Sequence, residues 1–245
     1  MKAIDPDLLL RAYSIGVFPM ADSRAADDVY WVEPKKRGIL PLNRFRLSRS
    51  LAKTIRSDRF TMTADQAFSQ VVAECAASTA DRPDTWINPA IEIAYADLHR
   101  RGHAHSVETW YDGRLVGGLY GVRLGGAFFG ESMFSRESNA SKVALAYLVA
   151  RLKAGRFRLL DCQFITDHLQ SLGAIEVSRD DYVALLDAAL GVSGGAMGAV
   201  SGWMSPDFFA IDALAPGGRA APPEMRTVSG PISGCTIVQL LGQTS

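Results

Sequence analysis

Residues 105–134, which read HSVETWYDGRLVGGLYGVRLGGAFFGESMF, decide the fold. Residues 105–111 alternate in polarity as a half-buried strand does, and the Asp112-Gly113 pair that follows is typical of a two-residue hairpin turn. Residues 115–124 predict a second strand. The Gly125-Gly126 pair then turns the chain into a third strand that runs to the end of the stretch. The sequence therefore predicts three consecutive antiparallel strands.

Helical and extended patterns alternate downstream of these strands. We expect a helix over 139–153, a strand over 158–164, and helices over 167–172 and 179–190. The order strand, strand, strand, helix, strand, helix is that of an acyltransferase-type (GNAT-like) α+β domain with a mainly antiparallel sheet. The helices expected upstream lie at 5–16, 48–57, 65–77 and 90–101, and residues 17–45 look irregular.

Composition suggests three regions. We expect a small N-terminal domain over residues 1–60, the GNAT-like domain over 61–190, and a tail over 191–245. The tail holds 10 of the 22 glycines and 5 of the 11 prolines, which is typical of a flexible segment. Only the stretch 203–214 looks able to pack, and the tail shows no chemistry. Its removal is therefore expected to leave activity intact.

The overall composition is that of a globular protein. The chain has 245 residues, no formal net charge and 48% hydrophobic residues, which support a packed core and exclude a mainly disordered chain. No stretch approaches the roughly 18 apolar residues of a membrane span, and the N-terminus lacks the apolar run of a signal peptide. Three widely spaced cysteines suggest no disulfide framework. We therefore expect a cytoplasmic protein.

The even charge balance hides a basic stripe. Residues 35–59 carry nine bases and one acid, a net charge of +8, and the rest of the chain carries −8. Such a stripe is typical of a protein that binds a nucleic-acid backbone, although Arg49, Lys53 and Arg56 would equally suit the solvated face of a helix. The nine bases are Lys35, Lys36, Arg37, Arg44, Arg46, Arg49, Lys53, Arg56 and Arg59.

Three polar residues stand out in apolar strands. Asp161 and Gln163 lie two apart on a predicted strand and should share one face, and Leu160 and Cys162 should point to the other. The polar pair can hold an amine nucleophile in line, or it can form a strand edge that faces water. Glu131 is the sole charge in its strand, so it must be paired or functional. A cationic ligand is one way to pair it.

The same domain offers an apolar pocket and a weak metal motif. Five apolar residues could line a pocket between the sheet and the 139–153 helix, although ordinary core packing explains each of them as well. They are Leu119, Phe128, Leu148, Leu152 and Leu160. His99, His103 and His105 are close in sequence, but no acid or cysteine has a ligand spacing to them, so we expect no metal. Cys162 is better explained as a buried thiol than as a nucleophile.

Six short motifs occur in order over residues 5–190. They are YSIGVFP at 13–19, TWI at 85–87, GHAHSVE at 102–108, GESMFS at 130–135, NASK at 139–142 and DCQ at 161–163. Together they resemble the leucyl/phenylalanyl-tRNA–protein transferase family. The resemblance implies transfer of Leu or Phe, and less readily Met, from aminoacyl-tRNA to proteins that begin with Arg or Lys. It also implies that the products enter the N-end rule pathway of degradation and that no cofactor is needed.

The resemblance also implies roles for single residues. Trp86 would stack on the 3′-adenosine of tRNA, and the five pocket residues above would hold the aminoacyl side chain. Glu131, Asp161 and Gln163 would surround the reacting centre and the acceptor. The family pattern has a second stacking tryptophan where this chain has Met20, which contacts a base more weakly than an indole.

The pocket also departs from the family pattern. Leu148 and Leu152 stand where aromatics are expected, so the preference between Leu and Phe stays open. The reaction needs no ATP, because an aminoacyl ester is already activated and the acceptor amine, with a pKa of about 7.7–8.0, is partly neutral at cytoplasmic pH. Either Asp161, Gln163 or the adenosine's own hydroxyl could take the amine proton.

Two other functions fit parts of the pattern. An acetyltransferase that uses acetyl-CoA would cradle pyrophosphate on a glycine-rich loop, and residues 135–142 contain no glycine. A non-catalytic tRNA-binding module would explain the basic stripe but would leave the three polar strand residues without a role. We therefore expect a monomeric aminoacyltransferase that binds aminoacyl-tRNA and not membranes. The backbone contacts expected within the stripe are Lys35, Lys36, Arg37, Arg46, Arg49 and Lys53.

Overall fold

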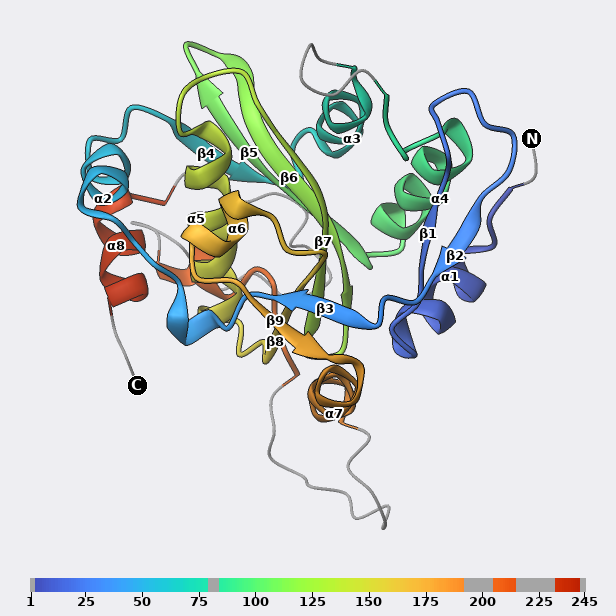
Figure 1. Ribbon diagram of the computed structural model, residues 1–245. Coiled ribbons are helices and arrows are strands. Elements are labelled where there is room, and N and C mark those ends of the chain that lie inside the picture. Colours follow the sequence, from blue (N-terminus) through green and yellow to red (C-terminus); the bar gives the residue numbers. More distant parts are fainter. Residues whose placement is uncertain (1–2, 79–83, 192–204, 215–231, 243–245) are drawn as a thin grey trace.

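The computed structural model describes residues 3–78, 84–191, 205–214 and 232–242 of the chain. Its centre is a seven-stranded sheet in the order β4-β5-β6-β7-β8-β3-β9 (Figure 1). Every neighbouring pair is antiparallel except β7 and β8, which run parallel. The strands are β3 (Lys36–Ile39), β4 (Thr61–Ala64), β5 (Ala104–Tyr111), β6 (Arg114–Leu124), β7 (Ala127–Ser135), β8 (Leu159–Gln163) and β9 (Ile175–Ser178). The predicted α+β fold with a mainly antiparallel sheet is confirmed.

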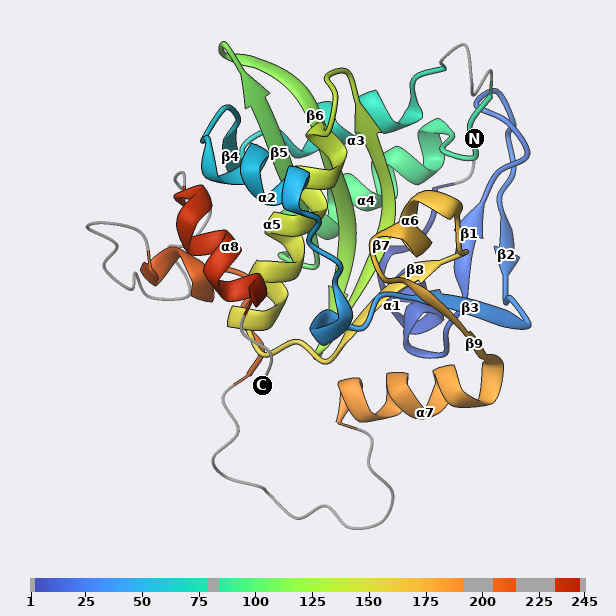
Figure 2. The same ribbon diagram turned by 60° about the vertical axis from the view of Figure 1, so that its left-hand side comes forward.

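Helices cover both faces of this sheet, so the molecule has three layers (Figures 1 and 2). One face packs on α5 (Ala140–Ala154), α2 (Arg49–Arg56), α6 (Asp167–Ser171) and α8 (Gly234–Gly242). The other packs on α1 (Pro6–Ser14), α3 (Phe68–Ala76), α4 (Pro89–Arg100) and α7 (Arg179–Leu190). Neighbouring residues of one strand serve opposite cores: Phe128 belongs to the first and Phe129 to the second.

Local sequence explains the central hairpin and its helix. Asp112 and Gly113 both have positive φ, 49° and 71°, as a tight two-residue turn requires. In α5 almost every residue from Ala140 to Leu152 is buried, because the helix lies between the sheet and the C-terminal elements. Short polar residues begin α2 and α4: Ser48 and Asn88 accept hydrogen bonds from the first turns of these helices.

The segment 17–45, expected to be irregular, contains three strands. β1 (Phe18–Met20) and β2 (Tyr30–Val32) form a small antiparallel sheet. β3 lies between β8 and β9, so the N-terminal part of the chain contributes a strand to the large sheet. These strands are only three or four residues long, too short for a period of two to be recognised.

The described parts of the tail pack against the core. Phe208, Ile211 and Ile237 are fully buried. The 3₁₀ helix η2 (Ala210–Leu214) lies within the stretch expected to pack, of which residues 203–204 are outside the described residues. Helix α8 was not expected at all. Its apolar run is short and follows a glycine- and proline-rich stretch, which concealed it in the sequence.

Candidate active site

A cavity of about 300 Å³ opens where the two parallel strands separate. The pairing of β7 with β8 ends at Phe129 and Asp161, and beyond this point β8 pairs only with β3. Past this point the described residues of β7 and β8 are not paired with each other, and side chains of both strands face the gap between them. Helices α5 and α6 form the other walls, and Trp86, from the loop before α4, also lines the cavity.

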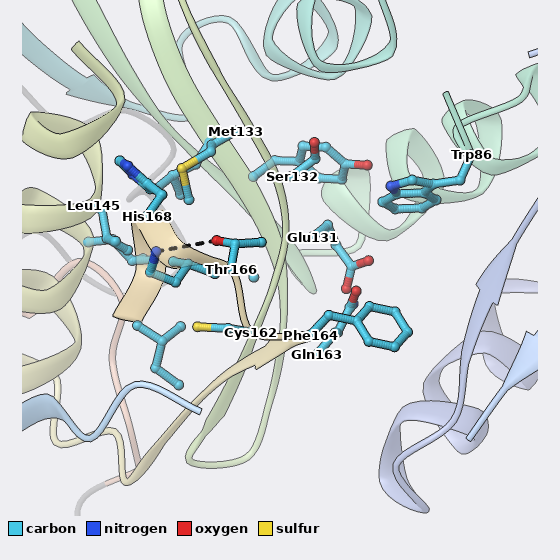
Figure 3. Close-up of a pocket in the computed structure, with 16 residues that line it drawn as sticks. Trp86, Glu131, Ser132, Met133, Leu145, Cys162, Gln163, Phe164, Thr166 and His168 are labelled. Carbon is cyan, nitrogen blue, oxygen red and sulfur yellow. Dashed lines mark hydrogen bonds between the residues drawn. The ribbon is translucent and has the colours of Figure 1, made fainter. Parts of the chain in front are cut away.

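The cavity is apolar at one end and polar towards the other. Figure 3 shows Met133, Leu145 and His168 at one end, and Trp86 and Phe164 at the opposite end. Apolar side chains dominate the lining, including Leu119, Leu145, Leu148, Leu160 and Leu169. Such a cavity suits an apolar side chain inside with polar groups at the entrance.

Three of the five predicted pocket residues line the cavity and two do not. Leu119, Leu148 and Leu160 face it. Phe128 and Leu152 are fully buried and absent from its lining. Phe128 instead packs behind the wall, stacked on Phe208 with ring centroids 5.7 Å apart. The structure thus places these two in the layer behind the wall, a distinction that sequence alone cannot make.

Glu131, on β7, lies at the cavity held by two tyrosines. Its Oε1 accepts a 2.7 Å hydrogen bond from Tyr13 of α1, and its Oε2 accepts a 2.9 Å bond from Tyr95 of α4. The two hydroxyls also contact each other at 2.6 Å. Burial raises the pKa of Glu131 to about 7, although the hydroxyl hydrogen bonds oppose this shift. Glu131 can therefore change its charge near neutral pH.

Asp161 has the opposite environment. Its carboxylate is fully buried and receives Arg37 through both oxygens, with Nη2 at 2.6 Å from Oδ2 and Nε at 2.9 Å from Oδ1. Tyr182 donates to Oδ2 at 2.8 Å, and the backbone N–H of Gln163 donates to Oδ1 at 2.7 Å. Asp161 does not line the cavity. The structure therefore places its carboxylate against Arg37, Tyr182 and the backbone of Gln163.

Arg37 corrects the prediction for the basic stripe. Only 1% of this residue is exposed, and its guanidinium lies between the rings of Phe18 and Tyr182, at 4.7 and 4.5 Å from their centroids. Its Nη1 also donates to the carbonyl of Gly16 at 2.7 Å. A buried cation cannot contact RNA phosphates. A count of charges along the sequence carries no information on burial, so Arg37 could not be separated from its exposed neighbours.

Gln163 departs from the predicted alternation of the strand. Its φ is +61°, which interrupts the regular pleat at the end of β8. As a result Gln163 lines the cavity together with Leu160 and Cys162, although it was expected on the face of Asp161. Its side-chain Nε2 is buried without a hydrogen bond of strict geometry in the described part of the chain, but the amide faces Glu131 and lowers the pKa of that carboxyl. Gln163 and Glu131 therefore stand side by side in the wall of the cavity.

Trp86 and Met20 belong to neighbouring segments. Trp86 lines the cavity, and its carbonyl accepts a 3.1 Å hydrogen bond from the backbone of Ala21. Met20, at the end of β1, is partly buried and does not reach the lining. Phe164 does line it, is 47% exposed, and packs edge-on against Phe18. Of the two residues expected at the adenosine, the structure brings only Trp86 to the cavity.

Exposed bases of the stripe lie on and around α2. Arg44, Arg46, Arg49 and Lys53 are exposed, and no ion pair involves them within the described residues. Lys35 is exposed as well. Lys36 is exposed but pairs with Glu176 at 2.7 Å.

Two of the three histidines considered for a metal, His99 and His105, have structural partners. His99 Nδ1 contacts the carbonyl of Ala104 at 2.8 Å, and His105 Nδ1 contacts Asp65 at 2.7 Å. Among the described residues, no group of three His, Cys, Asp or Glu side chains is arranged to hold a metal ion. No helix in that part of the chain is long and apolar enough to cross a bilayer.

Sequence reasoning missed the partners of both carboxyls. Tyr13 and Tyr95 reach Glu131 from 118 and 36 residues away, and Arg37 reaches Asp161 from 124 residues away. Spacing within one element cannot reveal such contacts. The one available signal was chemical: a buried carboxyl requires donors, and tyrosine and arginine are the side chains that supply them from apolar surroundings.

The order of strands and helices and the parallel pair that separates over an apolar cavity resemble the acyltransferase-type domain that the sequence predicted. Comparison with known proteins identifies the family to which the chain belongs. The sequence profile of the leucyl/phenylalanyl-tRNA protein transferases matches residues 39–187, and the profile of their N-terminal domain matches residues 2–35. The chain belongs to the leucyl/phenylalanyl-tRNA–protein transferase family, as the six motifs indicated.

Curated relatives carry the same name. A leucyl/phenylalanyl-tRNA–protein transferase of Rhizorhabdus wittichii is 82% identical over an alignment of 253 residues that covers all of both chains. One from Zymomonas mobilis is 70% identical over 187 residues, 76% of this chain and 70% of the relative. One from Afipia carboxidovorans is 54% identical over 213 residues, 87% of this chain and 88% of the relative.

Proposed function

We propose that this aminoacyltransferase moves Leu or Phe, and less readily Met, from aminoacyl-tRNA to proteins that begin with Arg or Lys. The products would enter N-end rule degradation in the cytoplasm, and the enzyme would act as a monomer. The observation that carries the proposal is the cavity itself. Its apolar part fits the side chain of the donor, and the carboxyl of Glu131 and the amide of Gln163 stand beside it.

The proposed reaction is an aminolysis. The lone pair of the acceptor's α-amine attacks the ester carbonyl, a C–N bond forms, and the bond to the ribose 3′ oxygen breaks. The proton that the amine loses ends on that oxygen. Orientation of amine against ester supplies most of the acceleration, because the ester is already activated. The Gln163 amide, which stands beside Glu131 in the wall of the cavity, would align the reacting groups.

Glu131 would attract the acceptor. A buried carboxyl with a pKa of about 7 gains strongly from a bound cation, and a terminal Arg or Lys brings one. Asp161 cannot do this, since Arg37 already neutralises it. Its proposed role is to hold the backbone of Gln163 through their 2.7 Å hydrogen bond. This differs from the direct role for Asp161 that the family resemblance implies.

Trp86 would stack on the terminal adenosine, because it lies at the end of the cavity opposite the apolar residues (Figure 3). Removing a stacking ring costs about 1–3 kcal/mol. Trp86→Ala should therefore raise the KM for aminoacyl-tRNA by a factor of about 5 to 150. Met20→Trp should lower that KM if the position reaches the base when tRNA binds. Unchanged tRNA kinetics in Trp86→Ala would remove the stacking assignment.

One assay tests the function as a whole. The protein is mixed with radiolabelled Leu-tRNA and a peptide that begins with Arg, and the label is followed into the peptide. Parallel reactions contain Phe-tRNA, Met-tRNA or acetyl-CoA, and peptides that begin with Lys, Ala or Asp. Transfer from Leu-tRNA to the Arg and Lys peptides is expected, with none to the Ala and Asp peptides. Label in the peptide only with acetyl-CoA would refute the proposal.

A further inference from the structure

The C-terminal segment lies beyond the family profile yet is part of the folded core. The profile ends at residue 187, whereas Phe208, Ile211, Ile232 and Ile237 are all buried further along the chain. The relative from Rhizorhabdus wittichii matches this chain throughout. A segment that is buried this well but carries no part of the cavity lining calls for a structural role towards some other part of the enzyme.

The first half of the segment anchors itself to α5 and the sheet. Phe208 stacks on His105 of β5 with ring centroids 4.3 Å apart. Arg151 of α5, almost fully buried, pairs with Asp212 at 2.9 Å and lies over the ring of Phe208. Tyr147 of α5 then donates a 2.9 Å hydrogen bond to the carbonyl of Ile232, just before α8. These contacts fix the position from which α8 starts.

In the second half of the C-terminal segment, α8 packs against α2 (Figure 2). The backbone N–H of Gly234 donates a 2.7 Å hydrogen bond to Asp58, directly after α2. A Cβ on Gly234 would lie 1.9 Å from the carbonyl oxygen of Ile55, so only glycine permits this approach. Ile237 and Val238 bury their side chains in the same core cluster as Leu51 and Ile55 of α2.

Helix α2 needs such support. It has eight residues, and a helix this short is not stable without tertiary packing. One face, with Leu51, Ala52 and Ile55, is buried, whereas the opposite face presents exposed bases. These are Arg49, Lys53 and Arg56. The direction in which the three charges point is therefore set by what α2 packs against.

We propose that α8 is a positioning element for RNA: it holds α2 so that the basic face of α2 meets the phosphate backbone of the tRNA body. The inference rests on the proposed function, and it assigns α8 no part in the chemistry. It separates two parts of donor binding. The cavity would bind the aminoacyl-adenosine end, and α2, braced by α8, would bind the distant backbone.

The test compares two glycines of the same helix. Gly234→Ala places a methyl group against Ile55 and should displace α8 from α2, whereas Gly242→Ala adds the same group where nothing lies within 4 Å. Each variant is assayed with two donors, full Leu-tRNA and the 3′-leucyl ester of adenosine, which lacks the tRNA body. We expect Gly234→Ala to raise the KM for Leu-tRNA at least fivefold, with kcat and the KM for the small ester unchanged. Gly242→Ala should change neither.

The salt dependence of tRNA binding is a second measurement. A general loss of protein stability would not change it in the way proposed. Each lost phosphate contact should reduce the slope of log Kd against log salt concentration by about 0.7–0.9, so Gly234→Ala should bind uncharged tRNA with a flatter slope. Equal losses with both donors, or no loss with either, would overturn the proposal. If Gly234→Ala does not fold, Ile237→Ala against Gln239→Ala, a buried and an exposed position of α8, gives the same comparison. If the wild-type protein transfers nothing from Leu-tRNA, the proposed function fails, while the slope with uncharged tRNA still decides the role of α8.

Discussion

Two buried carboxyls stand on neighbouring strands of this enzyme in opposite states. Asp161 of β8 is neutralised by Arg37 and receives two further hydrogen bonds, so its charge is satisfied by the protein alone. Glu131 of β7 has the hydroxyls of Tyr13 and Tyr95 and the amide of Gln163 as its donors, faces the cavity, and has a pKa raised to about 7. The contrast teaches that two buried carboxyls can differ in what satisfies them: a cation from the protein for Asp161, and neutral donors for Glu131.

Breaking the Arg37–Asp161 pair should give the largest effect. Arg37→Ala leaves a fully buried carboxylate without its cation, which typically costs about 3–5 kcal/mol of unfolding free energy. Lys36→Ala is the matched control, because the neighbouring side chain is 72% exposed and pairs only at the surface. Urea unfolding of the two variants measures the difference. Similar stabilities would show that Asp161 does not depend on Arg37.

Kinetics of two conservative substitutions should separate the roles of the carboxyls. Glu131→Gln should lower kcat/KM for an Arg peptide by about tenfold to a hundredfold, the value of a hydrogen bond to a charged group, and should weaken the preference for Arg over Ala peptides. Asp161→Asn should instead lower kcat for every acceptor, because it disturbs the Gln163 backbone. Binding of aminoacyl-tRNA should be nearly unchanged in both. An Asp161→Asn variant that transfers at the wild-type rate would contradict its supporting role.

The pKa of Glu131 predicts a pH dependence of stability. The folded state keeps a proton on Glu131 up to about pH 7, whereas the unfolded chain loses it near its ordinary value of 4.5. Stability from this group is therefore present below about pH 4.5 and is lost as the pH rises through 7. The unfolding free energy of wild type, measured against that of Glu131→Gln, should fall over this range and then level off. A constant difference would mean that Glu131 titrates normally in the folded protein.

The smallest effect is expected from single hydroxyls. Tyr13→Phe removes one donor to Glu131, which favours the protonated form and should move the pH range described above upward by up to about one pH unit. Tyr120→Phe is the control, because its hydroxyl has no hydrogen-bond partner in the described part of the chain although the residue lines the same cavity. The unfolding free energy of both variants is measured over the same pH series and compared. An equal shift in both would show that burial alone sets the pKa.

How far the sequence could predict this arrangement differs between the two strands. The hairpin turn at Asp112-Gly113 and the lone charge of Glu131 are local signals; the turn is confirmed, and Glu131 is buried and hydrogen-bonded in its strand. The environment of Asp161 was not predictable, because Arg37 lies in another strand and looked like part of a surface stripe. The position of the Gln163 side chain was missed because the alternation of polar and apolar residues does not reveal a positive φ.

The N-terminal strand β3 has a consequence for the order in which the molecule is made. The Asp161 cluster unites Gly16, Arg37, Asp161 and Tyr182, and Glu131 needs Tyr13. A chain synthesised from its N-terminus therefore cannot assemble both clusters before Tyr182 has left the ribosome. Contacts of such large sequence separation also form slowly. A nascent fragment that ends before α7 lacks Tyr182, so the hydrogen-bond network around Asp161 stays incomplete until α7 has emerged.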